Sequence, residues 1–256
     1  LEEGKFEFGS SNANSFFGQR SNIFKFNFWM MLKDINKFFN EAKKFNNDPS
    51  RDNSLTLGEF LSQGHYGLAF IEKFILPMGA AIWSSKSDDI KNQPATTFIN
   101  FFASHGLLQF NNPIKWQSVI GGSREYIKKL TKGYSQRVKL NAKVKSIQRK
   151  KSRIRVVDIL ACEHNFDHVV IATHADEALE IISDANKIET EILSKFKYNN
   201  SRVILHSDQS LMPHQKNVWS SWNFLGSTSS GVSVTYWMNL LQSLGNDNQY
   251  FVSVNP

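Results

Sequence analysis

An unbroken apolar run, Val169 to Ala172, has polar residues on both sides. The run is too short for a helix and too continuous for a half-exposed strand, so it predicts a central strand buried on both faces. Apolar residues with the spacing of an amphipathic helix follow from Ala175 to Ile182. A strand that ends in a polar turn before a helix is where α/β sheets bind nucleotides, because backbone N–H groups converge at the start of the helix.

The first half of the chain has helical periodicity. Apolar residues from Ser21 to Phe45 recur at helical spacing with lysines between them, which predicts a long amphipathic helix. Its aromatic stripe is most simply core packing, with a lipid-surface or acyl-binding role as the alternative. Thr56 and Glu59 have the spacing of a capping box and predict a short helix through Leu61. Further elements expected here are an edge strand over Leu1–Phe8 and helices over Leu68–Ile75, ending before Pro77, over Thr96–His105, ended by Gly106, and over Glu125–Leu130.

From Val138 onward the pattern changes to strands. The expected strands are Val138–Leu140, Val144–Arg149, Ile154–Leu160, Asp167–Ala172, Val203–His206, Val218–Phe224, Val232–Met238 and Phe251–Val254. A charged helix is expected from Asn186 to Lys197 between the fourth and fifth of them. This order predicts a mixed α/β (α+β) fold, in which a helical block is followed by a βαβ-like middle and then by an antiparallel sheet.

Composition limits the class of protein. With 256 residues, 41% of them hydrophobic, the chain can bury a sizeable core in one or two domains. The net charge is +7, and the basic residues are spread along the chain except around Lys139 to Arg155. A modest excess of this kind is typical of a solvated surface, so no nucleic-acid partner is expected. The single cysteine, Cys162, excludes an intramolecular disulfide framework and favours a reducing, cytoplasmic location. The chain starts at Leu1 and stops in a strand-like segment, so we expect it to be an internal fragment of a longer protein.

Several common chemistries lack support in the sequence. His164, His168 and His174 are too irregularly spaced to predict a zinc site, and we expect no metal. The Gly-x-Ser-x-Gly elbow of serine hydrolases is absent. The double glycine Gly121-Gly122 lacks the lysine of a phosphate-binding P-loop, so it is better explained as a close backbone approach before a helix.

Short motifs distributed over most of the chain carry a resemblance to a known family. They are Pro77–Ser84, His105–Leu108, Gly121–Arg124, Val138–Leu140, Val144–Ile147, Phe166–Thr173, Leu205–Asp208, Met212–Pro213, Trp219–Asn223 and Thr235–Asn239. Through them the chain resembles the superfamily of flavin-containing amine oxidases, protoporphyrinogen oxidases and phytoene desaturases. Within it, the chain is most similar to a bacterial group of FAD-dependent oxidoreductases known by prediction.

The resemblance implies the central part of a two-domain flavoprotein with FAD as its cofactor. Residues 1–133 would be the helical part of the substrate domain, and residues 186–256 its antiparallel-sheet part. Residues 134–185 would be a segment that returns to a Rossmann-like FAD domain. The sequence has no Gly-x-Gly-x-x-Gly, so the loop that holds the pyrophosphate is expected outside it, and this chain alone is expected to bind FAD poorly and to be inactive.

The resemblance also implies cofactor contacts. In the superfamily, the strand matching Val144 presents the backbone of its valine to the adenine edge, and the end of the buried strand, here Ala172 and Thr173, passes close to the ADP half. Without the resemblance, plain sheet packing would be the simplest explanation of all three positions.

The resemblance places the catalytic and substrate-binding residues on the later strands. The strand that runs under the flavin in the family can carry a lysine that holds a water near the flavin N5. The matching strand here, Val203–His206, has no lysine, so His206 is the nearest ionisable candidate, with a strand-end histidine meeting the carboxylate of Asp208 as the structural alternative. The aromatic residues Trp222, Tyr236 and Trp237 are candidates for contact with a flat or apolar substrate, and core packing is their alternative role.

Two functions follow from these expectations. The first is an FAD-dependent oxidoreductase that oxidises or isomerises a small apolar substrate, such as an apolar amine, a polyene or a lipid-like molecule. The alternative is a non-catalytic module whose aromatic helices bind a hydrophobic ligand or contact a membrane surface without a flavin. Nothing in the sequence predicts an oligomeric state.

Overall fold

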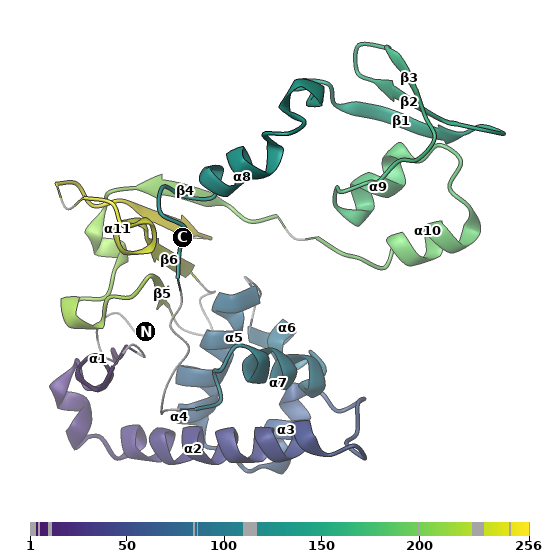
Figure 1. Cartoon of the computed structure of the whole chain (residues 1–256). Helices are drawn as coiled ribbons and strands as arrows, with labels where there is room; N and C mark the ends of the chain where they lie inside the picture. The colour runs from purple at the N-terminus through teal and green to yellow at the C-terminus, as the bar shows by residue number, and fades with distance from the viewer. Residues whose placement is uncertain are drawn as a thin grey trace. The chain divides into compact units, whose positions relative to one another are not determined.

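The computed structural model describes residues 4, 6–9, 12–83, 85, 87–109, 117–198, 200–226, 233–245 and 247–255. The chain divides into two compact units. Unit 1 comprises Leu1–Glu125 together with Ser201–Pro256, and unit 2 comprises Tyr126–Asn200. Each unit combines helices with an antiparallel sheet (Figure 1), so the fold is of the mixed α/β class that the sequence predicts.

Unit 1 consists of a helical block and a four-stranded sheet. Its helices are α1 (Ala13–Phe16), η2 (Arg20–Phe24), α2 (Phe26–Asn47), α3 (Leu57–Gln63), α4 (Leu68–Phe70), η3 (Ile71–Ile75), α5 (Leu76–Trp83), α6 (Ser87–Lys91), α7 (Ala95–Ser104), η5 (Gln209–Leu211), η6 (Lys216–Val218) and α11 (Met238–Gln242). Its strands are β4 (Val203–His206), β5 (Trp222–Leu225), β6 (Ser233–Trp237) and β7 (Phe251–Val254), antiparallel in the order β4-β7-β6-β5. The predicted strands β4 and β7 have the bounds expected from the sequence, whereas Val232, at the start of a third, lies outside the described residues.

Helix α2 supplies the centre of the unit 1 core. Its buried positions recur every three or four residues, as expected for one face of a helix, and they are Phe28, Met31, Asp34, Ile35, Phe38, Phe39 and Ala42. Phe38 packs edge-on against Phe60 with 6.0 Å between ring centroids, and it also meets Phe70 at 5.5 Å. Edge-to-face and tilted rings of this kind are favourable beyond their buried area. From Phe28 to Ala42 the stripe is therefore core packing, as the simpler interpretation of the sequence predicts, whereas Phe24, at its predicted start, is 90% exposed.

Capping and glycine packing fix the other helices. Thr56 accepts a hydrogen bond from the backbone N–H of Glu59, and the Glu59 carboxylate accepts one from the backbone N–H of Thr56, which confirms the predicted capping box of α3. A Cβ added at Gly79 of α5 would lie only 2.8 Å from Ile90 and 2.9 Å from Phe98. Glycine therefore permits the close approach of α5 to its neighbours.

The prediction that a helix stops before Pro77 is wrong. The backbone continues from α4 through the π-helical turn η3 into α5, so that Pro77 lies inside the helical stretch. Proline has no N–H to donate to the preceding turn. The wider turn of η3, directly before it, changes the hydrogen-bond spacing where that donor is missing, which lets the helix continue.

Unit 2 is a small sheet with helices beside it. Its elements are η4 (Ser135–Arg137), β1 (Val144–Arg149), β2 (Ile154–Asp158), β3 (Glu163–Phe166), α9 (Ala175–Ile181) and α10 (Lys187–Leu193), and α8 (Arg124–Thr131) spans the sequence boundary between the units. The strands form an antiparallel meander in the order β1-β2-β3. Ile147 and Val156 are buried in this sheet, and Ala178 of α9 is buried as well.

Two predicted strands are not formed, and a third lies partly outside the described residues. Val169–Ala172 is irregular and Val170 is 91% exposed, so it is not the doubly buried strand that its apolar run predicts. Such a strand needs neighbours on both edges, and among the described residues no strand pairs with it. Val138–Leu140 is likewise an exposed irregular stretch, and the described residues of Leu1–Phe8 form no strand. The strand adjoining β2 is instead β3, which the sequence analysis missed because its polar residues show no apolar alternation.

In the part of the chain that the structure describes, no helix combines the length and the apolar character needed to cross a bilayer.

The buried aromatic face of α2 is expected to determine the stability of unit 1. Phe38 is fully buried, so Phe38→Ala should lower the free energy of unfolding by about 3–5 kcal/mol. Phe24, two residues before α2, is 90% exposed. Phe24→Ala should therefore change the free energy of unfolding by less than about 0.5 kcal/mol. Urea unfolding followed by circular dichroism measures both values. Equal effects of the two substitutions would contradict the assignment of the core.

Candidate functional site

The sheet of unit 1 has two faces of different chemistry. Successive side chains of a strand point to opposite faces, and cross-strand partners share a face. The register therefore defines an apolar face, made of Val203, Leu205, Trp222, Phe224, Val234, Tyr236, Val252 and Val254. The opposite side, here called the polar face, is made of Ile204, His206, Asn223, Leu225, Ser233, Thr235, Trp237, Phe251 and Ser253.

The apolar face is covered at one end and open at the other. Val234 and Val254 are buried, and Phe224 packs against the helical core. By contrast, Leu205 is 71% exposed and Trp222 is 48% exposed. Trp222 and Tyr236 are cross-strand partners whose rings meet edge-on at 5.7 Å. None of the residues of this face is charged, so its open end is an uncharged aromatic and aliphatic wall.

The polar face contains a buried chain of hydrogen bonds that starts at His206. The ring Nε2 of His206 lies 2.8 Å from Ser253 Oγ, and Ser253 Oγ lies 2.7 Å from Thr235 Oγ1. Ser253 and Thr235 are both fully buried. The backbone N–H of Asp208 donates to His206 Nδ1 at 3.2 Å, so Nδ1 is the acceptor and Nε2 carries the hydrogen that it donates to Ser253. Both ring nitrogens of His206 are thus used within the protein.

The carboxylate of Asp208 stabilises the turn after β4. Its carboxylate accepts a hydrogen bond from the backbone N–H of Ser210 at 2.9 Å at the start of η5. The hydrogen bonds from the backbone and side chain of Ser210 hold the pKa of Asp208 below its ordinary value, with a smaller contribution from His206. The contact with His206 is made by the backbone of Asp208, and not by the carboxylate as the structural alternative in the sequence analysis has it.

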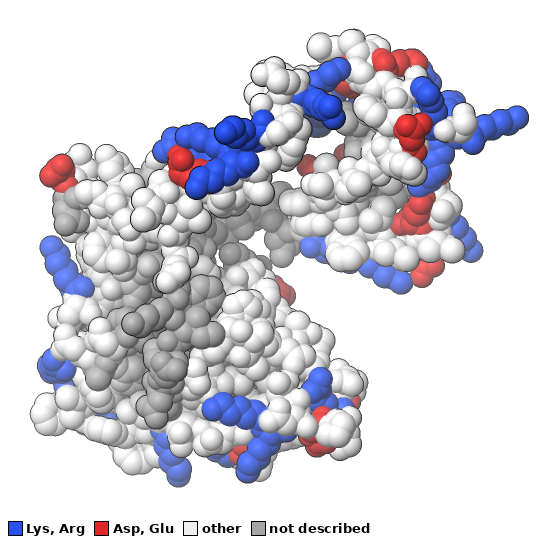
Figure 2. Space-filling model, in the orientation of Figure 1, with Lys and Arg blue, Asp and Glu red and all other residues white. Residues whose placement is uncertain are grey.

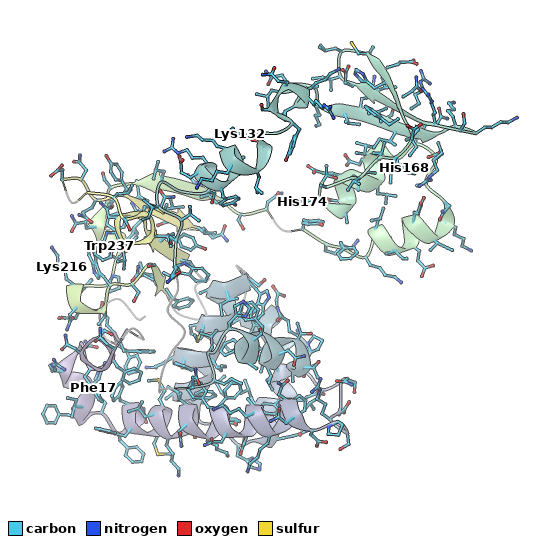
Figure 3. All side chains as sticks on the ribbon, in the orientation of Figure 1. Phe17, Lys132, His168, His174, Lys216 and Trp237 are labelled. Carbon is cyan, nitrogen blue, oxygen red and sulfur yellow. The ribbon has the colours of Figure 1, made fainter. Side chains whose placement is uncertain are left out.

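The three aromatic substrate candidates are not all together. Trp222 and Tyr236 share the apolar face, whereas Trp237, labelled in Figure 3, belongs to the polar face. There its ring meets Trp219 edge-on at 5.3 Å, and its indole N–H donates to Gln249 Oε1 at 2.7 Å. Trp237 therefore shares a face with His206, and the apolar wall contains only the other two candidates.

In unit 2, Val144 lies at an irregular end of a strand. It is the first residue of β1 and pairs with Asp158, but the register shifts between Val144 and Ser146. A bulge of this kind leaves one residue outside the regular ladder of backbone hydrogen bonds. The contact of the Val144 backbone with adenine, which the family resemblance implies, stays a prediction.

Ala172 and Thr173 are exposed and lie in an irregular stretch before α9. The hydroxyl of Thr173 donates to the carbonyl of His174 at 3.0 Å. The His174 ring, labelled in Figure 3, stacks on Tyr198 at 4.2 Å, and the Tyr198 hydroxyl accepts a hydrogen bond from the N–H of Ala175 at 2.9 Å. Tyr198 therefore fixes the end of this stretch, a role that its polar sequence surroundings did not reveal. The described contacts do not join Val144 to Ala172 or Thr173.

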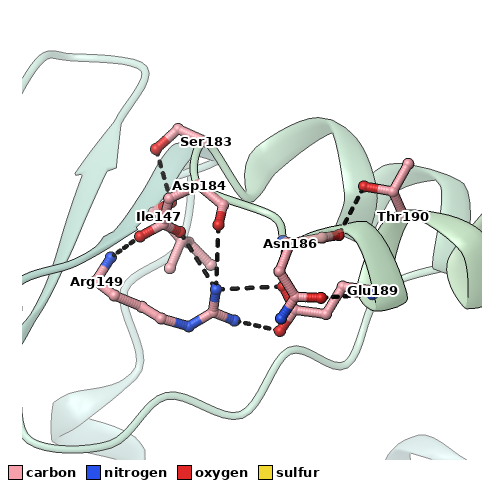
Figure 4. Close-up of polar contacts among 7 residues, drawn as sticks. All are labelled: Ile147, Arg149, Ser183, Asp184, Asn186, Glu189 and Thr190. Carbon is pink, nitrogen blue, oxygen red and sulfur yellow. Dashed lines mark hydrogen bonds and ion pairs between the residues drawn. The ribbon is translucent and has the colours of Figure 1, made fainter.

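An arginine links β1 to the segment after α9 (Figure 4). The Arg149 guanidinium donates two hydrogen bonds to Glu189, at 2.6 and 3.2 Å, and the Arg149 backbone N–H donates to the Asp184 carboxylate at 2.7 Å. Ser183 adds hydrogen bonds from its N–H and hydroxyl to the carbonyl of Ile147, at 2.9 and 3.0 Å. These contacts hold the chain that follows α9 against the edge of β1. The sequence analysis missed them.

Glu189 has a second partner in this network. It forms a capping box with Asn186 at the start of α10, a spacing that was readable in the sequence. The hydrogen bond from the backbone N–H of Asn186, followed by the interaction with Arg149, lowers the pKa of Glu189 from its ordinary value. Glu189 therefore stabilises both the helix start and the link to β1 as a carboxylate.

A metal centre finds no support in the geometry. Among the described residues, no three His, Cys, Asp or Glu side chains gather closely enough to hold an ion.

Comparison with known families decides the class of the protein. The model of the family described as flavin-containing amine oxidoreductase matches residues 2–246. The chain belongs to this family. The match confirms the superfamily expected from the sequence motifs and confirms a flavin, FAD, as the family's cofactor.

Solved structures of similar fold are known. The chain is similar to putrescine oxidase, solved in its wild-type form with putrescine, at 14% identity and a TM-score of 0.57, over 90% of this chain and 52% of that one. It is also similar to a CLA-producing fatty acid isomerase from P. acnes, at 13% identity and a TM-score of 0.58, over 91% of this chain and 54% of that one. The chain thus spans about half the length of these structures, and the likeness shows the fold alone. No protein of curated function matches it in sequence.

The buried hydroxyl pair of this family member is expected to stabilise the sheet as a unit. Ser253→Ala removes the partner of both Thr235 Oγ1 and His206 Nε2 and should lower the free energy of unfolding by about 1–3 kcal/mol. Thr235→Val removes one of the same hydrogen bonds. The free energy of unfolding that the double variant loses should therefore be smaller, by at least about 0.5 kcal/mol, than the sum of the losses in the two single variants. Urea titration of all four proteins measures this, with the exposed Ser207→Ala as a near-neutral control. Strictly additive losses would show that the two hydroxyls act separately.

The Arg149 network is expected to make unit 2 sensitive to acid. The pKa of Glu189 is lowered in the fold, so its contribution to stability is present above the unfolded value and is lost as pH falls through the folded value, below the ordinary 4.5. Glu189→Gln should therefore lower the melting temperature at neutral pH, and the difference from wild type should shrink towards zero at about pH 3. Thermal unfolding across this range measures it. Glu191→Gln, which replaces a solvent-exposed carboxylate on the same helix, is the control.

A constant difference between the Glu189→Gln variant and wild type over the whole range would contradict this role. It would mean that the effect of the substitution on stability does not depend on the ionisation of Glu189.

Proposed function

We propose that this chain forms the substrate-binding portion and part of the FAD-binding portion of a flavin-dependent oxidoreductase that oxidises or isomerises an apolar substrate. The observation that carries the proposal is the open end of the apolar face, where Leu205, Trp222 and Tyr236 offer an uncharged wall. In an enzyme of the flavin-containing amine oxidoreductase family, the flavin performs the redox step. The protein's part is to bind the substrate and to hold it against the cofactor.

The chemistry of the wall favours one class of substrate. Covering exposed leucine and tryptophan side chains gains about 25 cal/mol for each Å² of apolar surface removed from water. A diamine, in contrast, would bring two positive charges to a face without a carboxylate, and their lost hydration would go uncompensated. The fold similarity includes both a putrescine oxidase and a fatty acid isomerase. The uncharged wall supports a lipid-like or polyene substrate, or an amine that is largely apolar, over a diamine.

The proposal assigns the parts of the chain as follows. Residues 1–133 and 186–256 would build the substrate domain, and residues 134–185 would complete the FAD domain. There the backbone of Val144 would meet the adenine edge, and Ala172 and Thr173 would lie along the ADP half. The sequence has no Gly-x-Gly-x-x-Gly and spans about half of the similar structures, so the phosphate loop would come from a further part of a longer protein.

The role of His206 in this proposal is narrower than that of a catalytic residue. It is the ionisable residue proposed for the strand that passes the flavin. Because both of its ring nitrogens are already hydrogen-bonded, at Asp208 N and Ser253 Oγ, its contribution would be to position β4 and the turn after it. Trp237 would support the same side of the sheet, and Trp222 with Tyr236 would contact the substrate.

The proposal is tested on the full-length protein that contains this chain. It should purify yellow, with flavin absorbance, and should convert a long-chain unsaturated fatty acid in preference to putrescine. Leu205→Lys should leave the flavin content unchanged and raise the KM for the fatty acid about tenfold or more, because it places a charge on the apolar wall. Leu240→Lys, at a 51% exposed position on α11 that is not part of this face, is the matched control.

Anaerobic flavin reduction detects oxidation in these proteins, and mass spectrometry of the products detects isomerisation. A colourless full-length protein would overturn the flavin assignment. Preference for putrescine, or equal KM values for Leu205→Lys and Leu240→Lys, would overturn the assignment of the apolar wall.

A further inference from the structure

A group of large apolar side chains at the start of α2 is exposed to solvent. Ile23 is 38% exposed, Phe24 90%, Phe26 75% and Trp29 49%. We call these four residues the aromatic patch. It contrasts with the rest of the helix, where residues such as Phe28 and Phe38 are fully buried.

The backbone explains why these residues lie outside the core. Lys25, between η2 and α2, has an extended conformation with φ −96° and ψ 118°. This interruption removes Phe24 from the helical stripe that Phe28 begins. The patch is nevertheless fixed to the unit, because the Trp29 indole N–H donates to the carbonyl of Ile23 at 2.8 Å. The Trp29 ring also lies 6.1 Å from the buried ring of Phe28. The side chains of the patch are thus exposed to solvent, while contacts with the protein hold the segment that carries them.

Among the described residues of the stretch that carries the patch, from Phe8 to Lys33, all charged side chains are basic. The sequence from Phe8 to Lys33 contains no Asp or Glu, but it contains Arg20, Lys25 and Lys33. All three basic residues are exposed. Figure 2 shows blue side chains and no red ones over the end of unit 1 that carries α1 and the start of α2. A surface that complements this patch must therefore be apolar at its centre and negatively charged around it.

An anionic phospholipid bilayer meets both requirements. Tryptophan and phenylalanine partition into the interfacial layer between head groups and acyl chains, and nearby Lys and Arg are attracted by anionic head groups. A second copy of the chain fits less well, because a two-fold dimer through this patch would bring Arg20, Lys25 and Lys33 close to their own counterparts. The charge complementarity thus favours the lipid surface.

We propose that the aromatic patch, with Arg20, Lys25 and Lys33, docks unit 1 onto the surface of an anionic phospholipid membrane. The contact is peripheral: Phe24, Phe26 and Trp29 enter the interfacial layer, and the remainder of α2 keeps its buried face in the protein core. This inference goes beyond the proposed enzymatic function and does not depend on a bound flavin.

The test is sedimentation of the purified chain with vesicles of phosphatidylcholine alone and of phosphatidylcholine with phosphatidylserine. Wild type should bind the anionic vesicles at least tenfold more tightly than the neutral ones, and added salt should weaken the binding. The double variant Phe24→Ser/Phe26→Ser should lose at least tenfold in binding. Because both side chains are exposed, the variant should keep its melting temperature. Leu68→Ser, at a 71% exposed position elsewhere in unit 1, should bind like wild type.

The charges are tested on the same helix. Lys33→Gln should weaken binding to the anionic vesicles, whereas Lys44→Gln, at the other end of α2, should not. Binding that is absent, equal for neutral and anionic vesicles, or unchanged in Phe24→Ser/Phe26→Ser would overturn the proposal. Light scattering without vesicles distinguishes the alternative: a dimer that this double variant abolishes, with no vesicle binding, would make the patch an interface between copies of the chain.

Discussion

Burial of one aromatic face of α2 is the interaction on which unit 1 depends. Phe38 alone brings together the ring of Phe60 from α3 and the ring of Phe70 from α4. The nearly buried carboxylate of Asp34 accepts a hydrogen bond from the N–H of Gly67, which ties the turn before α4 to the same helix. The sheet joins this core through Phe224. Because that contact covers only one end of the apolar face, the end that carries Leu205 and Trp222 stays open.

The alternation of side chains along β6 is the second constraint, and it decides the candidate site. Tyr236 and Trp237 are neighbours in sequence, yet they must occupy opposite faces. Tyr236 joins the apolar wall, while Trp237 lies with Trp219 and His206 on the face that contains the buried hydroxyl pair. The sequence identifies Tyr236, Trp237 and His206 as candidates. The sequence alone does not show which of them share a face of the sheet, because that depends on the register between the strands and on which face is covered.

Several local signals were predicted correctly, although the expected helix end before Pro77 was not, and signals that depend on distant partners were missed. The capping box of Thr56 and the bounds of β4 and β7 follow from residues close together in the chain. The run at Val170 has the composition of a buried strand, but no described strand pairs with it, so its burial cannot be inferred from composition. Strand β3 has the opposite character: its polar residues give no pattern, and pairing with β2 alone makes it a strand. The contact of Arg149 with Glu189 joins residues 40 positions apart, beyond the reach of any sequence pattern.

The place of each aromatic residue in the fold, more than its residue type, decides its role in this chain. Phe24 and Phe28 are four residues apart, a spacing that would place both on one helical face, yet one is 90% exposed and the other fully buried. The extended backbone at Lys25 makes the difference. The two exposed apolar surfaces that result, on α2 and on the sheet, belong to the same unit but share no residue, so membrane docking and substrate binding can each be wrong without the other. If both proposals are correct, the low solubility of a lipid-like substrate in water connects them. Such a substrate is concentrated in bilayers, and an enzyme docked on the bilayer surface would meet it there.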